Sequence, residues 1–380
     1  MWLNSKNNDK QKNIYVFILI IYFASSILSK TIWIYSLDTN FEYLLKLVRY
    51  FAYIVCMFKI LFDNYYFKDL WKMAIILMFI LVAGYFSAST LLFTYIFIFV
   101  SSYKIEKKTI IICSVSMQFL MWLIIVISSQ IGLNEDYIFD VGTRNRHSLG
   151  FTWTTTPAVF LFFMSLEYMY LRKKRIKNIE YIIILIMSYV LYHLTNARFT
   201  FGLSVIATVC FWLLNNTKFF LLFIKKLRFI WILMPVIITV FSYSIHRYYE
   251  IGNWMWEKFD NLLSGRLKLG NSAVEQYGIK LFGQPIEWIT HSYQAKEGVY
   301  NYVDCSYLQI LIQYGVVFLG ICLGMYTYIL LKSTREEDYH LCGCILVILI
   351  FCITEPFLLN LTFNPFPLLA VSYLGERKKK

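Results

Sequence analysis

Residues 303–331 read VDCSYLQILIQYGVVFLGICLGMYTYILL, a stretch with a single charged side chain, that of Asp304. A helix needs about 20 mostly apolar residues to cross the hydrocarbon of a bilayer, and this stretch is longer than that. It directly follows the one long polar segment of the chain, which runs from about His246 to Tyr302. The two together predict a membrane span that begins where a large loop ends.

The composition extends this interpretation to the whole chain. Of its 380 residues, 59% are hydrophobic and 16% are charged, whereas soluble domains carry roughly one quarter charged residues. We therefore predict an all-α integral membrane protein, a single polytopic domain over residues 1–380, with about 12 transmembrane helices. The predicted spans are 14–34, 41–62, 71–85, 87–103, 109–131, 147–170, 179–195, 198–215, 222–245, 303–331, 340–356 and 360–375. The third and fourth are short and meet near Gly84, so they form either one kinked helix or a helical hairpin.

Basic residues gather in alternate loops, and this predicts the orientation. Cytoplasmic loops of membrane proteins carry an excess of lysine and arginine. The clusters within 104–108, 172–177 and 218–228 fall on one side of a twelve-span arrangement, together with both termini. We predict a multi-pass protein of the bacterial cytoplasmic membrane with both termini in the cytoplasm. The loop 246–302, between the ninth and tenth spans, then faces outward.

Charge and cysteine patterns argue against several other classes. The formal net charge of +13 does not indicate a nucleic-acid partner, because the basic residues lie in short clusters between spans. The eight cysteines form no CxxC pair and no Cys/His cluster, so neither a disulfide framework nor a zinc site is predicted. We also find no outward acidic cluster with metal-ligand spacing, no P-loop, no HExxH and no dinucleotide fingerprint. The prediction is therefore no metal and no cofactor.

Arginines near the predicted outer surface are candidates for binding phosphate. A guanidinium offers two parallel donors and keeps its charge, and an arginine at a membrane boundary is costly unless it is paired or reaches water. We predict that Arg146, Arg198 and Arg266 bind a diphosphate, with Arg144 and His147 as further substrate contacts. The alternative for each arginine is that it reaches lipid phosphates or pairs with a loop carboxylate.

Asp304 is the candidate general base, because it lies at the junction of loop and span. Poor solvation there raises the pKa of a carboxyl group toward the range in which it can accept a proton from a hydroxyl. The alternative is a helix N-cap, a position that favours Asp. His291 is a second acid/base candidate. Trp288 and Tyr307 are predicted to contact sugar, although an interfacial aromatic belt explains such residues almost equally well.

Three short motifs resemble the Wzy-type polysaccharide polymerases, which are related to the O-antigen ligases. Arg146-x-Ser148-Leu149-Gly150-Phe151 resembles the arginine-plus-SLGF segment of Gram-positive capsule and exopolysaccharide polymerases. Thr195-Asn196-Ala197-Arg198 resembles their short outer turn with an arginine. Asp304-Cys305, nine residues and Gly315, preceded by Leu281-Phe282-Gly283, resembles the ligase pattern of His-Asn, nine residues and glycine. Asp304 replaces the ligase histidine and Cys305 the asparagine.

The resemblance implies a metal-independent, inverting membrane glycosyltransferase. It would polymerise undecaprenyl diphosphate-linked oligosaccharide repeat units into a surface polysaccharide. Arg146, Arg198 and Arg266 would hold the diphosphate, and Asp304 would accept the proton, with His291 in reserve. The implied partners are the lipid-linked substrate and the bilayer, with a chain-length regulator and a flippase as further partners.

Two other function classes stay open. A lipid-linked oligosaccharide flippase or other transporter is expected to show charges in mid-span and two similar halves, and neither is apparent in the sequence. A membrane O-acyltransferase needs an embedded histidine, for which His193 is the one candidate.

Overall fold

The structure is a computed structural model that describes residues 2–37, 40–141, 144–290 and 300–376. Within these ranges it holds sixteen α-helices, two short 3-10 helices and one two-stranded sheet. Seven of the described helices are long and apolar enough to cross a membrane, which makes the chain a multi-pass membrane protein. They are Asp9–Leu28 of α1 (Trp2–Leu28), α4 (Phe67–Phe86), α6 (Lys107–Gln130), α8 (Asn178–Thr195), α9 (Arg198–Asn216), α11 (Arg228–Arg247) and α14 (Ser306–Arg335).

The predicted count of twelve spans is not confirmed, although each predicted span overlaps a helix. Part of the shortfall has a physical reason, because α5 (Thr90–Ser101) and α15 (Tyr339–Phe351) are only about 18 and 20 Å long at 1.5 Å per residue. The hydrocarbon core is about 30 Å thick. The predicted third and fourth spans form a hairpin of α4 and α5 joined at residues 87–89, not one kinked helix.

The remaining elements complete the bundle. They are α2 (Trp33–Ser36), α3 (Asn40–Phe62), α7 (Thr156–Arg172), η1 (Lys173–Arg175), α10 (Lys218–Lys226), α12 (Trp254–Leu262), α13 (Arg266–Tyr277), η2 (Phe366–Leu368) and α16 (Leu369–Gly375). Helix α7 packs against four other helices, α6, α8, α9 and α15. Its sequence TPAVFLFFMSLEYMYLR is apolar around most of its circumference, the pattern of a helix buried on all sides.

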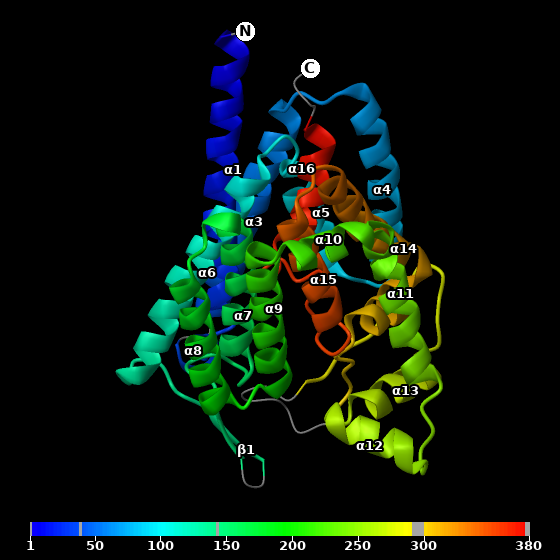
Figure 1. Cartoon of the computed structure of the whole chain (residues 1–380). Helices are drawn as coiled ribbons and strands as arrows, with labels where there is room; N and C mark the ends of the chain where they lie inside the picture. The colour runs from blue at the N-terminus through cyan, green and yellow to red at the C-terminus, as the bar shows by residue number, and fades with distance from the viewer. Residues whose placement is uncertain (1, 38–39, 142–143, 291–299, 377–380) are drawn as a thin grey trace.

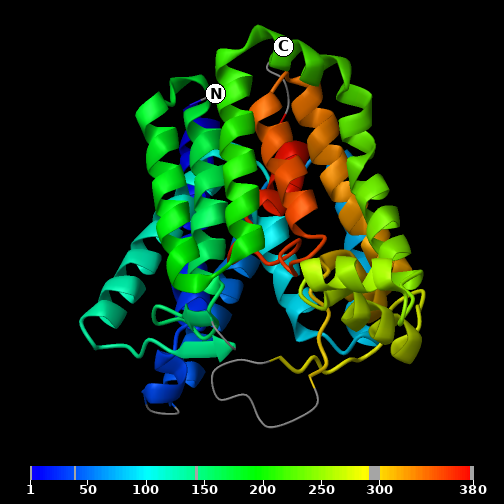
Figure 2. The same cartoon turned by 60° about the horizontal axis from the view of Figure 1, so that its bottom comes forward.

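The two ends of the molecule differ in structure. Both termini lie at one end, which we call the termini end (Figure 1). The antiparallel hairpin of β1 (Ile138–Val141) and β2 (Arg144–His147) lies at the other, the hairpin end, with α12 and α13. Figure 2 shows the hairpin and the α12–α13 pair on opposite sides of this end. This β-hairpin was not predicted from the sequence, which indicated an all-α fold. The predicted span 147–170 becomes helical only at Thr156.

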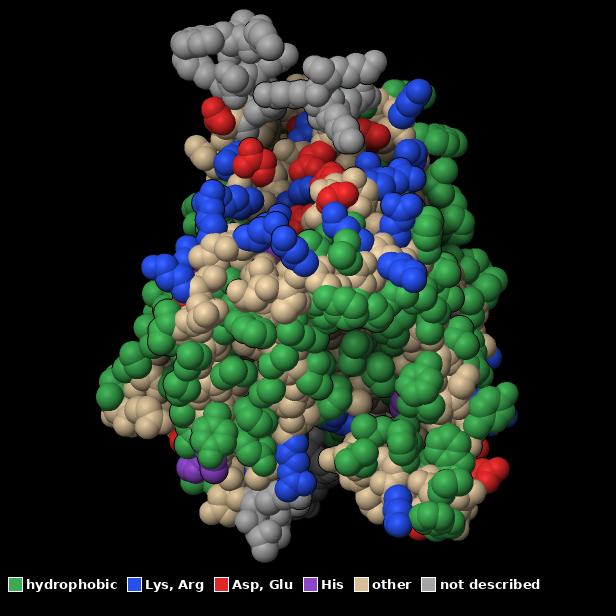
Figure 3. All heavy atoms as spheres, viewed as in Figure 1, with side chains coloured by type: hydrophobic (Ala, Val, Ile, Leu, Met, Phe, Trp, Pro, Cys, Tyr) green, Lys and Arg blue, Asp and Glu red, His purple; other side chains and the backbone are tan. Residues whose placement is uncertain are grey.

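The surface agrees with a membrane setting. Figure 3 shows a wide belt of apolar side chains around the middle of the face in view. Most of the charged side chains on this face lie above that belt, at the termini end. The large loop and the termini are thus at opposite ends, as the sequence predicts; which end faces the cytoplasm stays a prediction.

An irregular segment, residues 352–365, lies between α15 and η2 and is buried along most of its length. We call it the buried turn. Helix α15 begins at the termini end, and α16 returns there, where Tyr373 Oη donates to Glu336 Oε2 at 3.3 Å. The predicted spans 340–356 and 360–375 are therefore two short helices that enter and leave at the same end. Irregular backbone at membrane depth is tolerated only where protein or water satisfies its polar groups.

Polar side chains from neighbouring helices meet that requirement. The Gln118 amide of α6 donates to the carbonyls of Thr362 at 3.2 Å and Phe363 at 3.0 Å. Within the turn, the Asn364 amide donates to the Leu358 carbonyl at 3.0 Å. The shape of the buried turn thus depends on a few amide side chains, one of them more than 200 residues away in the sequence.

Candidate functional site

Arg266 bridges two carboxylates at the hairpin end. Its Nε lies 3.2 Å from Asp304 Oδ2, and its Nη2 lies 2.8 Å from Glu355 Oε1. The three residues come from separate parts of the chain, since Arg266 begins α13, Asp304 precedes α14 and Glu355 lies in the buried turn. Their side chains are 23%, 19% and 9% exposed, so the ion pairs are largely shielded from water. We call these three residues the carboxylate cluster.

Local hydrogen bonds hold the cluster together. Ser306, the first residue of α14, donates from its backbone to the Cys352 carbonyl at 3.0 Å and from its hydroxyl to the Glu355 carbonyl at 2.6 Å. These bonds tie the start of α14 to the buried turn and keep Asp304 beside Glu355. The alternative role of Asp304 as an N-cap does not fit this geometry, because Cys305 occupies the N-cap position.

Burial raises the pKa of both carboxyl groups in the cluster. The charge of Arg266 lowers both pKa values, but this effect is smaller than that of burial. The Asp304 carboxylate further raises the pKa of Glu355, and the charge of Arg146 lowers it slightly. One guanidinium balances only one negative charge, so the doubly ionised cluster carries an uncompensated charge in a poorly hydrated place. The state in which one of the two carboxyl groups is protonated is therefore favoured. Carboxyl pairs of this kind can accept and return a proton.

Two further arginines lie near the turn between α8 and α9. Arg146 Nε donates to the Thr195 carbonyl at 3.0 Å, which ties β2 to the last residue of α8. Asn196 then adopts the left-handed conformation, with φ +53°, and Arg198 begins α9. The Arg198 side chain is exposed and forms no hydrogen bond or ion pair with the described residues. Arg146 also lowers the pKa of Glu355 slightly through its charge, and both this pair and the carboxylate cluster lie at the hairpin end.

The segment that resembles SLGF shapes the hairpin that carries Arg146. His147 Nδ1 lies 2.6 Å from Asp136 Oδ2, and the same carboxylate accepts a hydrogen bond from the Leu149 backbone at 2.7 Å. Ser148 Oγ accepts a hydrogen bond from the Tyr137 backbone at 2.9 Å. His147 thus has a structural partner, and its predicted contact with substrate stays a prediction.

The spaced glycine of the third motif has a steric reason. Helix α14 is interrupted at Gly315, with φ +86° and ψ 171°, and the loop residue Gly283, with φ +91°, crosses it there. A Cβ atom on Gly315 would lie 2.4 Å from the Gly283 nitrogen, and one on Gly283 would lie 2.3 Å from the Gln313 oxygen. Neither position accepts a side chain, because positive φ and the close approach both favour glycine. The contact joins the large loop to α14 eleven residues after Asp304.

The predicted aromatic contacts lie in different environments. Trp288 donates to Gln313 Oε1 at 2.8 Å and packs edge-on against Tyr302, two residues before Asp304. Tyr307 is 1% exposed and donates to the Leu349 carbonyl at 2.7 Å. Trp288 therefore borders the site, whereas Tyr307 packs in the interior.

Two predicted residues cannot be placed at the site. His291 lies outside the described residues. Arg144 begins β2, but its side chain also lies outside the described part of the structure.

Two buried carboxylates are missing from the sequence-based candidates. Glu355 is a lone acid within the apolar predicted span 340–356, and an ionisable residue at membrane depth is by default a functional candidate. Glu167 of α7 is 0% exposed and faces Ser114 and Gln118, neither of which donates to it with good hydrogen-bond geometry. It lies near the C-terminal end of α7, so the expectation that no charge lies in mid-span is not overturned. Among the described residues, no three His, Cys, Asp or Glu side chains are grouped as metal ligands.

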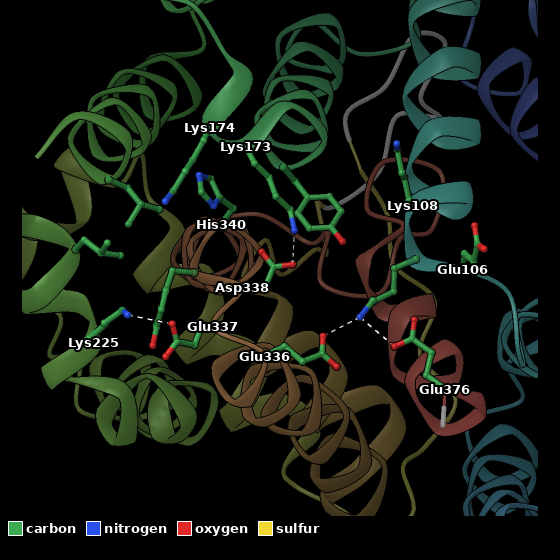
Figure 4. Close-up of a pocket in the computed structure, with 15 residues that line it drawn as sticks. Glu106, Lys108, Lys173, Lys174, Lys225, Glu336, Glu337, Asp338, His340 and Glu376 are labelled. Atoms are coloured by element: carbon green, nitrogen blue, oxygen red, sulfur yellow. Dashed lines mark hydrogen bonds and ion pairs between the residues drawn. The ribbon is translucent and has the colours of Figure 1, made fainter. Parts of the chain in front are cut away.

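A second ionic region lines a cavity of about 720 Å³ at the termini end, the termini pocket (Figure 4). Lys107 bridges Glu336 and Glu376 at 3.0 Å each, and Lys173 pairs with Asp338 at 2.7 Å. The Glu336 and Glu376 side chains are 36% and 37% exposed. None of the sequence-predicted site residues that the structure describes lines this cavity.

The structure therefore brings Asp304 and Arg266 together with Glu355, and Arg146 with the turn that carries Arg198. It leaves Tyr307 apart from them. Comparisons of the chain with family models, with curated proteins and with solved structures find no match. Any function has to be inferred from the residues of this chain.

Proposed function

We propose that the protein polymerises lipid-linked oligosaccharide repeat units by inverting glycosyl transfer on the outer face of the bacterial cytoplasmic membrane. The carrier in this proposal is undecaprenyl diphosphate. One observation carries it: the buried carboxylate cluster lies at the same end of the molecule as Arg146, which is bonded to the Arg198 turn. The motif resemblance to Wzy-type polymerases supports it. The orientation, with the hairpin end outward, rests on the basic loops.

Arg146 and Arg198 would bind the diphosphate and stabilise the charge that develops as it leaves, because charge-assisted bonds aimed at a leaving group lower the barrier. Arg198 is the more available of the two, since its side chain is exposed and unpaired within the described structure. Arg266 fits another role. Its guanidinium already faces two carboxylates, so it positions them and its predicted contact with phosphate is not favoured.

Asp304 would act as the general base, because it is the more exposed carboxylate of the cluster. In the proposed step, a sugar hydroxyl of one repeat unit attacks the anomeric carbon of the growing chain. The bond from that carbon to the diphosphate oxygen breaks, the diphosphate keeps the electron pair, and the hydroxyl proton passes to Asp304. The proton is then released to water, which restores the base.

Deletion of the gene in its own host tests the proposal, with surface and lipid-linked glycans separated on gels. Loss of long polymer together with single lipid-linked units exposed on the outer face supports a polymerase. Units trapped on the cytoplasmic face would indicate a flippase. Unchanged chain length with altered substituents would indicate an acyltransferase.

Complementation of the deletion strain tests the assignment of the site. The R198A variant should not restore polymer. The control R247A, which changes an exposed arginine at the end of α11, should restore it.

A lipid-linked oligosaccharide transporter is the second candidate, favoured by the buried Glu167 in α7. It predicts that E167Q traps repeat units inside, while the polymerase proposal predicts normal polymer from that variant. The acyltransferase has no such support, since His193 is exposed at the end of α8 and packs against Tyr189 with ring centres 4.6 Å apart.

A further inference from the structure

An apolar groove of about 590 Å³ runs between α4, α5, α14 and α16. Its volume lies within the range of roughly 300–1,000 Å³ that is usual for small-molecule sites. The lining is hydrophobic apart from Tyr95 and Tyr328 and one charged residue, Lys72. No residue of the carboxylate cluster lines it, so it is separate from the site already described.

The groove is about as long as one leaflet is thick. On α14 its lining runs from Phe318 to Tyr328, which is about 15 Å at 1.5 Å per residue, and half of the hydrocarbon core is also about 15 Å. Lys72 and Leu374 place its polar mouth at the termini end. Ile76 lines the groove and stays 39% exposed, so the groove is open toward the bilayer.

Two lysines that form no ion pair with the described residues flank this mouth. Lys72 is exposed and forms no ion pair with the described residues. Lys332 lies one turn beyond Tyr328, with Nζ 5.5 Å from that ring's centre, and likewise forms no ion pair within the described structure. The acids that act electrostatically on Tyr328 have other partners: Asp69 accepts a hydrogen bond from Tyr103 at 2.8 Å, and Glu336 and Glu376 pair with Lys107. In the termini pocket, by contrast, Lys107 and Lys173 are matched by carboxylates.

We propose that the groove binds one anionic phospholipid of the leaflet at the termini end. One acyl chain lies between α4 and α14, and the headgroup phosphate contacts Lys72 and Lys332. Burial of an apolar chain supplies affinity, and cationic side chains near the headgroup region select negative charge. The chain of the lipid carrier fits less well, because the charged mouth lies at the opposite end from Arg146 and Arg198.

Lipid retained by the purified full-length protein tests this proposal. After extraction in a mild detergent and extensive washing, native mass spectrometry counts bound lipid, and extraction into organic solvent identifies it. The wild type should retain one anionic phospholipid per chain. K72E and K332E should each lower retention by about fivefold, and I76W should abolish it by filling the groove. Matched controls are K68E, on the same helix but not lining the groove, and I237W on the exposed face of α11.

Equal retention in K72E, K332E and K68E would overturn the proposal. So would a retained polyprenyl phosphate, a zwitterionic lipid or detergent alone in the wild type. Size-exclusion profiles and melting temperatures separate loss of lipid from loss of fold, and K72E keeps the test valid if I76W does not fold. The outcome does not depend on the proposed polymerase activity, because no glycan is measured.

Discussion

The two ends of the molecule each place one cation between two carboxylates, but in different surroundings. In the termini pocket, Lys107 lies 3.0 Å from both Glu336 and Glu376; in the carboxylate cluster the corresponding distances are 3.2 and 2.8 Å. The acids are 36% and 37% exposed at the first site but 19% and 9% at the second. Exposed ion pairs contribute little free energy, whereas breaking a buried one leaves an uncompensated charge. Burial, more than residue type, therefore distinguishes the hairpin end and makes it the candidate for the proposed proton chemistry.

Removing the buried cation should have the largest effect. R266Q leaves two neighbouring carboxylates without a counter-charge, so we expect the free energy of unfolding to fall by about 3–5 kcal/mol. Unfolding of the protein in lipid nanodiscs measures the change. R247Q is the matched control, with an expected change within about 0.5 kcal/mol because its side chain is exposed. Equal stability of the two variants would contradict a buried cluster.

Loss of the amide that supports the buried turn should have a smaller effect. Q118A removes the donor to the carbonyls of Thr362 and Phe363, and we expect a loss of about 1–3 kcal/mol because buried acceptors stay unsatisfied. Gln130, exposed at the end of the same helix, supplies the control Q130A. If both variants unfold alike, the turn does not depend on Gln118.

The cluster should also make stability depend on pH. Because the folded pKa of Glu355 lies above its unfolded value, the folded protein binds more protons between those two pKa values. Stability is then highest below the ordinary carboxyl pKa and falls as pH rises toward the raised one, by about 1.4 kcal/mol per pH unit for one proton. E355Q should flatten this dependence in a series of melting curves. A slope unchanged from that of the wild type would show that Glu355 does not hold the proton.

The smallest effect is expected in the termini pocket. K107A breaks two pairs whose acids are more than one third exposed, so we expect a loss of about 1 kcal/mol or less. The difference in the free energy of unfolding between K107A and the wild type should be smaller still at high salt, because exposed charges are screened. A loss as large as that of R266Q would remove the distinction between the two ends.

The sequence predicted the coarse arrangement because apolar runs and basic loops are local signals. The membrane class, the large loop opposite the termini, and Arg266 and Asp304 as site candidates all follow from such patterns. The contact of Arg266 with Glu355 does not, because 89 residues separate them and no local periodicity encodes their meeting. Glu355 was not predicted as a site residue because the apolar residues around it resemble a complete membrane span. That span is in fact a short helix and a turn held by the distant Gln118.

The most direct test of the central claim is polymer formation in vitro. Lipid-linked repeat units isolated from the deletion strain are added to the purified protein in nanodiscs, and the glycan length is followed on gels. Wild type and R247Q should extend the units into polymer. D304N should yield single units only, although it stays folded, because its amide cannot accept the hydroxyl proton. Polymer from D304N at the rate of the wild type would contradict the assignment of the carboxylate cluster as the reaction centre.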